Sequence, residues 1–530
     1  MTRLAPTIHR GPKALGPLET VPALALRRAV EDPTALAVID GATGETLTRG
    51  ELAARSAALA AGLRVRGVGA GDLVALALPN LAWWPVAALG VWRAGAAIVP
   101  LSPLWTAPEA ARVLAPVRPR LGIAFGPFAP LVRAAFDEAG IEAELFVVGD
   151  SGSGASVADL LTEPAGDPID APALELGDLA AVPFSSGTGG LPKGVRLTHG
   201  NVAASAGTAM ESLGCVSAVD DRSTVLACAP FFHSLGMSLT LTGALSVGAR
   251  IVTLPRPQLE PVLGLTANHR VTHMAVPPPM VEGFARDPRV DEHDLSSLAT
   301  VATGGAAVPP HLLNEASARL DALVAEGYGI TEATCMVSGP LGRPSTPGMT
   351  GWLVRGTEAR VVDPETGADL PDGEPGELLV RSPQIMEGYH GLPEETAATL
   401  DTDGWMRTGD LVAIRPDGQL EIRDRLKELI KVGGASVAPA ELELVLREHP
   451  AVRDAGVIGR PDPQQGEVPV AFVSLAAEAE PGELRAFVAE RVAAYKQLSE
   501  VHLVEELPRL PTGKLLRRAL RERAGSAAPA

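Results

Sequence analysis

Residues Ser185 to Gly194 read Ser-Ser-Gly-Thr-Gly-Gly-Leu-Pro-Lys-Gly, and this stretch points most directly to fold and function. It follows an apolar run, Leu179–Phe184, that predicts a short buried strand. Glycines let backbone amides approach an anion, hydroxyl groups add donors, and Lys193 adds positive charge. The stretch therefore predicts a phosphate-binding loop, although Gly/Ser/Thr clusters also form ordinary loops. It is not the common P-loop, because no Gly-Lys-Ser/Thr follows at the required spacing.

Composition indicates a globular protein of several domains. The chain has 530 residues, of which 46% are hydrophobic and 20% charged. Its formal net charge of −18 opposes binding to nucleic acid and to anionic membranes. The longest apolar stretch, Leu81–Trp92, is too short to span a bilayer, and the N-terminus lacks a signal-peptide pattern. Three cysteines show neither metal spacing nor an even framework, so we expect a cytoplasmic protein.

The first two thirds of the chain alternate helix and strand patterns. This rhythm predicts βαβ units and parallel sheets. Residues 148–175 are rich in Gly, Ser, Pro and acidic side chains, which indicates a surface loop or linker. The expected helices are Leu52–Leu63, Pro85–Ala94 and Ala107–Leu114, and the expected strands are Asp72–Leu78, Ala97–Pro100, Thr224–Cys228, Arg250–Leu254 and Thr272–Val276.

The pattern changes from Thr357 onward. Short apolar strands are separated by turns, and Asp372-Gly373 and Asp417-Gly418 are hairpin signals. This segment predicts a small antiparallel barrel or sheet. After Asp424 a smaller α+β unit begins, with helices expected at Pro439–Glu448 and Glu483–Ala494 and a disordered tail after residue 523.

Four further segments carry chemistry that a protein core does not need. Glu326–Ala333 (EGYGITEA) puts an aromatic ring, a hydroxyl and a carboxylate on a glycine-rich loop; the ring suits stacking on a base and the carboxylate suits Mg²⁺. Gly404–Asp410 (GWMRTGD) ends in a carboxylate able to accept bonds from sugar hydroxyls. Asp424–Lys427 (DRLK) follows, and Pro508–Lys514 (PRLPTGK) presents one lysine on a loop near the end.

Taken in this order, the five segments resemble the adenylate-forming superfamily of acyl-CoA synthetases, 4-coumarate–CoA ligases, nonribosomal adenylation domains and luciferases, over nearly the whole chain. The resemblance implies an α/β fold with a large N-terminal domain (1–424) of two sheet-and-helix subdomains plus a small β-barrel. A smaller mobile α+β C-terminal domain (425–530) follows, with a hinge near Lys427. It also implies an enzyme that uses ATP and Mg²⁺ to turn a carboxylic acid into an acyl-AMP with release of pyrophosphate, and then into a thioester with coenzyme A.

The resemblance gives four residues catalytic roles. Lys514 is expected to bridge the carboxylate and the α-phosphate during adenylation, and Thr331 to lie near the same phosphate. His233 matches a histidine near the acyl carbonyl, although a lone histidine is more often structural. Lys431 matches a lysine in the segment that faces the site after the C-terminal domain has turned for the thioester step.

The resemblance also assigns the nucleotide contacts. Tyr328 is expected to stack on adenine, Asp410 to bind the ribose hydroxyls with support from Arg425, and Glu332 to be the Mg²⁺ ligand. The other nucleotide contacts are expected from Ser185, Ser186, Gly187, Thr188, Gly189, Lys193, Gly305, Ala306 and Gly329.

The acyl pocket is expected to be small-sided and apolar, which suits an aryl or medium-chain acid. Ordinary core packing remains the alternative at each single position. The expected pocket residues are His233, Ser234, Met237, Ala302, Gly304, Thr334, Cys335 and Met336.

Five positions depart from the pattern of the superfamily or of its 4-coumarate–CoA ligases. Gly189 stands where a threonine is usual, Leu235 replaces a tyrosine, Ala302 a lysine, Arg407 a histidine and Ser436 a glutamine. These differences put hydroxycinnamate specificity in doubt, and the one at Ser436 touches the segment tied to the thioester step.

Other functions stay open at this point. The activated acid could pass to a separate carrier protein or to an amine, as in diazo-forming relatives that activate nitrite. A non-catalytic nucleotide-binding protein is a third possibility, against which Lys514, Glu332, Asp410 and Arg425 argue together. The family also suggests a homodimer.

Overall fold

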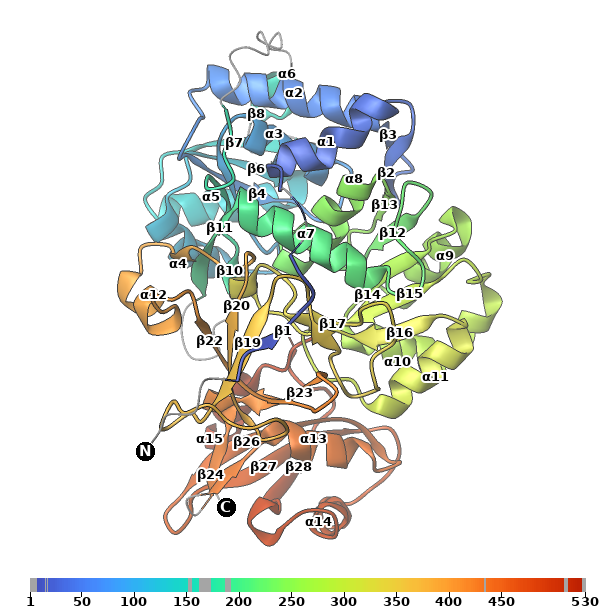
Figure 1. Ribbon diagram of the computed structural model, residues 1–530, viewed down its shortest axis with the longest axis vertical. Helices are drawn as coiled ribbons and strands as arrows, with labels where there is room; N and C mark the ends of the chain where they lie inside the picture. Colours follow the sequence, from blue (N-terminus) through green and yellow to red (C-terminus); the bar gives the residue numbers. More distant parts are fainter. Residues whose placement is uncertain are drawn as a thin grey trace.

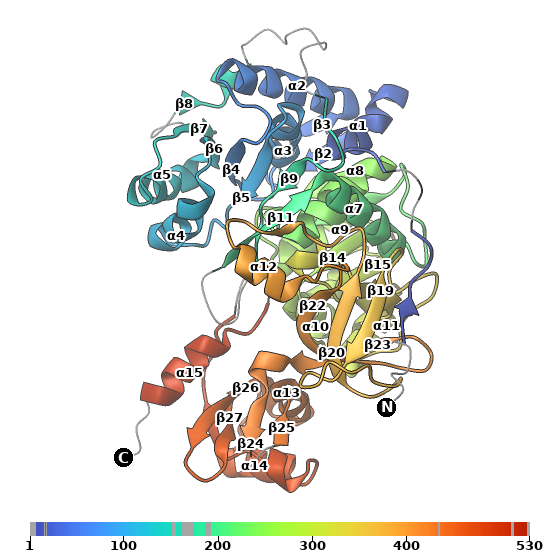
Figure 2. The same cartoon turned by 60° about the vertical axis from the view of Figure 1, so that its left-hand side comes forward.

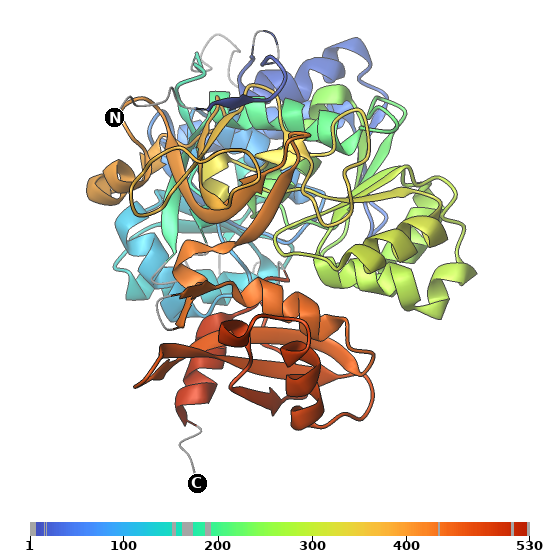
Figure 3. The ribbon, with the colours of Figure 1, turned by 60° about the horizontal axis from the view of Figure 1, so that its bottom comes forward.

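The computed structural model describes residues 7–14, 16, 18–150, 155–161, 173–185, 192–432, 435–509 and 513–526. They form a large body and a smaller C-terminal unit below it in Figure 1, and Figure 2 and Figure 3 show this separation from two other sides. Among the helices that the structure describes, none combines the length and the apolar character that a membrane crossing requires.

The first sheet of the large body has the order β10-β11-β9-β5-β4-β6-β7-β8, with β21 paired to β11. Its centre is parallel and buried, as the apolar runs predicted. The expected strand Leu179–Phe184 is instead two short strands, interrupted at Val182 and Pro183, because proline has no N–H for a ladder. The bounds are β4 Leu73–Ala77, β5 Ala97–Pro100, β6 Leu121–Phe125, β7 Glu144–Val148, β8 Ala155–Ser156, β9 Leu179–Ala181, β10 Phe184–Ser185, β11 Lys193–Thr198 and β21 Gly388–Tyr389.

The second sheet has the order β16-β15-β14-β12-β13-β2-β3 and is parallel except at β3. One apolar core joins the two sheets, with Val74 and Ile98 from the first, Val225 and Ile251 from the second, and Trp84 between them. The bounds are β2 Leu36–Asp40, β3 Thr46–Thr48, β12 Thr224–Ala227, β13 Arg250–Thr253, β14 His273–Val276, β15 Thr300–Thr303 and β16 Leu323–Glu326.

The helices of the large body cover these two sheets (Figure 1). A capping box between Thr48 and Glu51 starts α2 three residues before the expected helix. A short helix, α6, lies inside the segment expected to be only loop. The bounds are α1 Val21–Glu31, α2 Arg49–Val65, α3 Trp83–Arg93, α4 Ala107–Val117, α5 Ala129–Glu138, α6 Ala158–Leu161, α7 His199–Leu213, α8 Ala244–Val247, α9 Leu259–His269, α10 Pro278–Arg286, α11 Pro310–Leu320 and α12 Pro393–Thr399, with a π-helix η3 at Gly236–Gly243.

The third sheet is antiparallel, in the order β1-β19-β20-β22-β23, and forms the half-barrel that the Gly/Pro/Asp turns predicted. The hairpin between β22 and β23 turns at Gly418, whose φ of 82° favours glycine. The bounds are β1 His9–Arg10, β19 Glu358–Val362, β20 Gly376–Arg381, β22 Met406–Ile414 and β23 Leu420–Arg425. A separate two-stranded sheet pairs β17 Ser338–Gly339 with β18 Trp352–Leu353.

The C-terminal unit is the expected α+β body, with its own apolar cluster around Ile430, Leu442 and Val457. The second predicted helix ends at Ala489 rather than at Ala494, because the chain must turn there to place β28 beside β27. The expected tail after residue 523 is still helical up to Ser526. The bounds are β24 Ile430–Val432, β25 Ala435–Val437, α13 Pro439–Arg447, β26 Val452–Asp462, β27 Gly466–Leu475, α14 Pro481–Ala489, β28 Glu500–Leu503 and α15 Arg517–Ser526.

Candidate active site

A cavity of about 550 Å³ opens where the second sheet, the half-barrel and the C-terminal unit meet. Residues that directly follow the carboxyl ends of β12, β14, β15 and β16 line it, and this edge is where open parallel sheets bind ligands. The cavity brings together most of the predicted site residues: Ser185, Lys193, His233, Ser234, Ala302, Gly304, Gly305, Tyr328, Gly329, Thr331, Glu332, Cys335, Met336, Arg425 and Lys514.

Four predicted site residues lie elsewhere, and a fifth, Asp410, lies behind the cavity wall without lining it. The side chain of Met237 is packed in the main core, and the Thr334 hydroxyl donates to the carbonyl of Gln384 at 2.5 Å, so neither lines the cavity. Ala306 follows the lining glycines without lining the cavity itself. Lys431 is exposed on β24, where its Nζ donates to Ser436 Oγ at 2.7 Å.

The ends of the predicted phosphate-binding loop lie beside each other. Ser185 in β10 pairs with Lys193 in β11, and both side chains line the cavity. The Lys193 ammonium lies 4.7 Å from the ring centroid of Tyr389. Four predicted contacts, Ser186, Gly187, Thr188 and Gly189, lie outside the described residues.

Tyr389 is a cavity residue that the sequence did not reveal. Its hydroxyl donates to Glu332 Oε1 at 2.9 Å, so it orients the carboxylate expected to hold Mg²⁺. Burial and the charge of Glu332 raise the pKa of Tyr389, which therefore keeps its proton for this bond. No motif could have found it, because Tyr389 reaches the site through the pairing of β21 with Val195 in β11.

Asp410 is buried behind the cavity wall between two partners. Tyr328 Oη donates to Asp410 Oδ2 at 2.5 Å, and Arg425 Nε lies 3.0 Å from Oδ1. Burial raises the pKa of Asp410, and the Arg425 charge opposes this effect. The three side chains come from the loop after β16 and from the neighbouring strands β22 and β23, so they form a rigid wall.

Lys514 lines the cavity and comes from the C-terminal unit. Burial, together with the positive charges of Arg425 and Lys427, lowers its pKa to about 8. Asp410 opposes this effect. Lys427, at the predicted hinge, also lines the cavity, so two lysines and Arg425 gather at this end. Such a positive cluster suits a polyanionic ligand.

His233 also lines the cavity, from the segment just before the π-helix η3. Burial lowers its pKa to about 4, so the imidazole is neutral at neutral pH. A neutral ring can orient an acyl group but adds no charge. Small and apolar side chains also line the cavity, including several that the sequence did not single out: Leu213, Cys228, Ala229, Leu239, Val276 and Pro340.

Two of the three cysteines, Cys228 and Cys335, border the cavity. Burial raises the pKa of each thiol to about 12, so both stay protonated. They are therefore wall residues and not nucleophiles.

Comparison with protein-family models finds two matches. Residues 26–390 match the model described as AMP-binding enzyme, and residues 441–514 match the AMP-binding enzyme C-terminal domain. Among curated proteins, 4-coumarate–CoA ligase 5 of Oryza sativa subsp. japonica is 38% identical over 506 residues, which is 93% of this chain and 92% of the relative.

Solved structures give the same picture at lower identity. The anthranilate CoA ligase AuaEII in complex with anthranoyl-AMP is 26% identical, with a TM-score of 0.88 over 97% of this chain and 98% of that one. The amide bond synthetase McbA from Marinactinospora thermotolerans is 28% identical, with a TM-score of 0.83 over 95% of this chain and 99% of that one.

Proposed function

Because this chain belongs to the family of AMP-binding enzymes, we propose that it activates a carboxylic acid with ATP and passes the acyl group to coenzyme A. The similarity to a 4-coumarate–CoA ligase supports coenzyme A as the acceptor of the acyl group. One observation carries the proposal: Lys514 from the C-terminal unit lines the same cavity as Lys193, Glu332 and Arg425.

The first step joins the acid to the α-phosphate of ATP. A carboxylate oxygen attacks the α-phosphorus, the bond to the β-phosphate oxygen breaks, and pyrophosphate leaves. Lys514 holds the carboxylate and the α-phosphate together, and Lys193 offsets charge on the outer phosphates. Positioning and electrostatics dominate such a reaction, because the phosphoryl group needs little help with covalent chemistry.

Mg²⁺ fits the site through Glu332, whose carboxylate faces the cavity and is oriented by Tyr389. Proteins hold Mg²⁺ through one or two carboxylates together with substrate phosphates, which agrees with a single protein ligand here. When bound, Mg²⁺ would supply positive charge beside the phosphates. Asp410, fixed by Tyr328 and Arg425, is expected to accept the ribose hydroxyls.

The second step transfers the acyl group. The thiol of coenzyme A attacks the carbonyl carbon of the adenylate, the bond to the phosphate oxygen breaks, AMP leaves and the thiol proton passes to solvent. Lys431 lies outside the cavity in this arrangement and faces solvent from β24. We therefore expect the C-terminal unit to turn about Lys427 between the steps, so that β24 replaces Lys514 at the site.

The acid that the pocket suits best is an aryl or medium-chain acid without a second charge. The cavity lining near the proposed acyl group carries no group that is charged at neutral pH at Ala302, Cys228 or Leu239, and His233 is neutral. A second carboxylate buried there would lack a partner, and burying an unpaired charge is costly. Leu235 also lines the cavity in place of the family's tyrosine, which supports an acid other than a hydroxycinnamate.

Pyrophosphate release over a broad acid panel tests this function. The panel contains benzoates, cinnamates, straight-chain acids, dicarboxylates and nitrite, each with and without coenzyme A. We expect pyrophosphate release with an aryl or medium-chain acid that carries no second charge, and thioester only when coenzyme A is present. Turnover with dicarboxylates alone would contradict the proposed acid class, and AMP without any thioester would contradict the proposed acceptor.

The adenylation step should lose rate as the pH rises through about 8. Lys514 is charged below its pKa of about 8 and neutral above it, and only the ammonium can offset phosphate charge. The kcat/KM of acid-dependent pyrophosphate release, measured from pH 6 to 10, should fall on the alkaline side. Thioester formation from preformed acyl-AMP should not fall over that range. A parallel alkaline loss in both steps would contradict the role of Lys514.

An amine acceptor is the second candidate. The likeness to the amide bond synthetase McbA favours it, as does Ser436 in the segment that we expect to face the site in the second step. Adding aryl and alkyl amines to the same panel separates the two acceptors. An amide product formed faster than the thioester would support this second function.

A further inference from the structure

Backbone pairing joins the chain just before the Lys514 segment to the chain just after Lys514. Arg509 and Leu515 form an antiparallel bridge, and the Leu516 amide donates to the carbonyl of Pro508 at 2.8 Å. Leu515 is buried in an apolar cluster formed with Leu507, Ile458, Val470, Phe472 and Leu520. Lys514 is therefore followed directly by Leu515, a residue that is fixed in the C-terminal unit.

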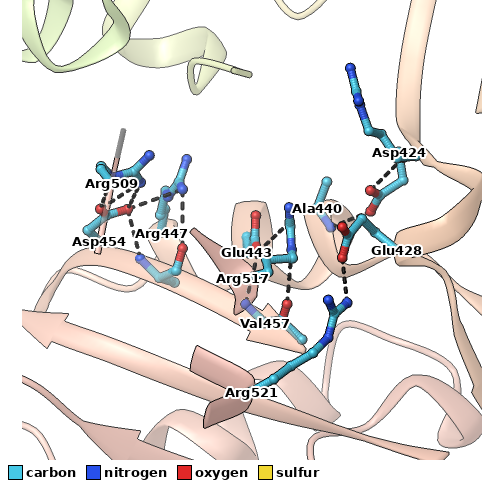
Figure 4. A network of polar contacts seen from close by, with 12 residues as sticks. Asp424, Glu428, Ala440, Glu443, Arg447, Asp454, Val457, Arg509, Arg517 and Arg521 are labelled. Carbon is cyan, nitrogen blue, oxygen red and sulfur yellow. Dashed lines mark hydrogen bonds and ion pairs between the residues drawn. The ribbon is translucent and has the colours of Figure 1, made fainter. Parts of the chain in front are cut away.

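Arg509 binds a carboxylate on the strand beneath it. Its Nε lies 3.0 Å from Asp454 Oδ2, and its Nη2 lies 2.8 Å from Oδ1 and 2.7 Å from Oδ2 (Figure 4). Asp454 lies on β26 and also contacts Arg447 of α13 at 3.1 Å. A two-pronged pair of this kind fixes orientation as well as distance. The Arg509 guanidinium is thus tied to two elements of the C-terminal unit.

The third nitrogen of the same guanidinium reaches the backbone next to Lys514. Arg509 Nη1 donates to the carbonyl of Gly513. That carbonyl belongs to the peptide unit that joins Gly513 to Lys514, and a peptide unit is planar. Fixing its oxygen therefore fixes the direction in which the backbone enters Lys514.

Gly513 also lies close to the large body. Its φ of 82° favours glycine, and a Cβ there would lie 3.2 Å from Pro279 Cδ and 3.3 Å from Pro278 Cδ at the start of α10. Arg509 therefore binds the peptide before Lys514, and Pro278 and Pro279 leave little free space beside it.

Two other arginines hold the chain after Lys514. Arg517 Nη2 donates to Glu443 Oε1 at 2.7 Å, and Arg521 Nη2 donates to Glu428 Oε2 at 2.5 Å (Figure 4). Glu443 and Glu428 are buried, so losing either arginine would leave a buried charge and threaten the fold. Arg509 and Asp454 are 22% and 24% exposed, and their pair can be removed at lower cost.

We propose that Arg509 is a positioning residue for adenylate formation, which aims Lys514 into the cavity through its bonds to Asp454 and to the Gly513 carbonyl. The inference rests on the proposed role of Lys514. A lysine has a long flexible stem, so a directed backbone narrows the arrangements that its ammonium samples. Small misplacements of a charged group at a reacting centre can cost roughly 100-fold in rate.

The test is a double-mutant cycle on separate half-reactions. Arg509→Ala should lower the kcat of acid-dependent pyrophosphate release by roughly 10-fold to 100-fold, with little change in the KM for ATP. Thioester formation from preformed acyl-AMP should stay within about twofold of the unaltered protein, because Lys514 is expected to leave the cavity before that step. In the Lys514→Ala background, Arg509→Ala should cause no further loss, because its effect passes through that lysine.

Matched variants separate positioning from folding. Asp454→Asn keeps the shape of its side chain and should repeat the pattern of Arg509→Ala, whereas Arg509→Lys should recover part of the rate. Arg460→Ala removes a comparable pair on the same strand, 2.6 Å from Glu500, and should leave both half-reactions unchanged. Thermal unfolding of every variant is followed in parallel.

Three results would overturn the inference and leave the proposed function intact. They are a further loss from Arg509→Ala in the Lys514→Ala background, equal losses in both half-reactions, and full adenylation by Arg509→Ala. Full adenylation by Lys514→Ala would instead overturn the proposed role of Lys514, on which the inference rests.

Discussion

Replacing Lys514 with alanine should reduce adenylate formation by roughly 100-fold or more, the loss typical of removing a group that stabilises developing charge. The ammonium of Lys514 lines the cavity beside Arg425 and Lys427. Among the described residues 513–516, Lys514 is the only one with a charged side chain. Acid-dependent pyrophosphate release with the best acid of the panel measures this step.

The same variant should form thioester from preformed acyl-AMP at nearly the normal rate, because Lys514 is expected to leave the cavity before that step. Lys496→Ala is a matched control: its Nζ pairs with Glu441 at 2.7 Å, away from the cavity. Equal loss of both half-reactions in Lys514→Ala would contradict a C-terminal unit that turns between two arrangements.

Replacing Glu332 with glutamine should raise the Mg²⁺ concentration needed for half-maximal adenylation, and should lower the maximal rate by roughly 100-fold. Glutamine keeps the size of the side chain and an oxygen that can accept the Tyr389 hydroxyl. The variant therefore removes the charge and keeps the local packing. A Mg²⁺ titration of pyrophosphate release measures the effect.

Glu387→Gln is the control for this second prediction. Glu387 lies two residues from Tyr389 and pairs with Arg196 at the surface, 2.7 Å away, without lining the cavity. It should leave the Mg²⁺ dependence unchanged. If Glu332→Gln shows the same Mg²⁺ dependence as the unaltered protein, Glu332 is not the metal ligand.

The order of elements could be predicted because local patterns encode it. Buried strands such as β4 and β5 are uninterrupted apolar runs, and glycine turns such as Asp417-Gly418 mark the half-barrel. Sequence patterns were less informative where tertiary contacts set the bounds of a strand or helix. Pro183 divides one expected strand, and α14 ends early because β28 must reach β27.

The site could be predicted wherever its residues lie in contiguous motifs, as for Thr331, Glu332 and Lys514. Side-chain contacts between residues far apart in the sequence gave no signal. Tyr389 reaches Glu332 across 57 positions, and Arg509 reaches Asp454 across 55. Thr334 fails as a pocket residue because its hydroxyl is used by the Gln384 carbonyl, a contact that no spacing rule describes.

In the proposed function, the protein couples an acid to coenzyme A through an acyl adenylate. The most direct measurement follows AMP and acyl-CoA together, by mass spectrometry, with ATP, Mg²⁺, coenzyme A and the best acid of the panel. We predict that the two products form in equal amounts, and that without coenzyme A only enzyme-bound acyl-AMP accumulates. AMP release in excess with no acyl-CoA would contradict the claim.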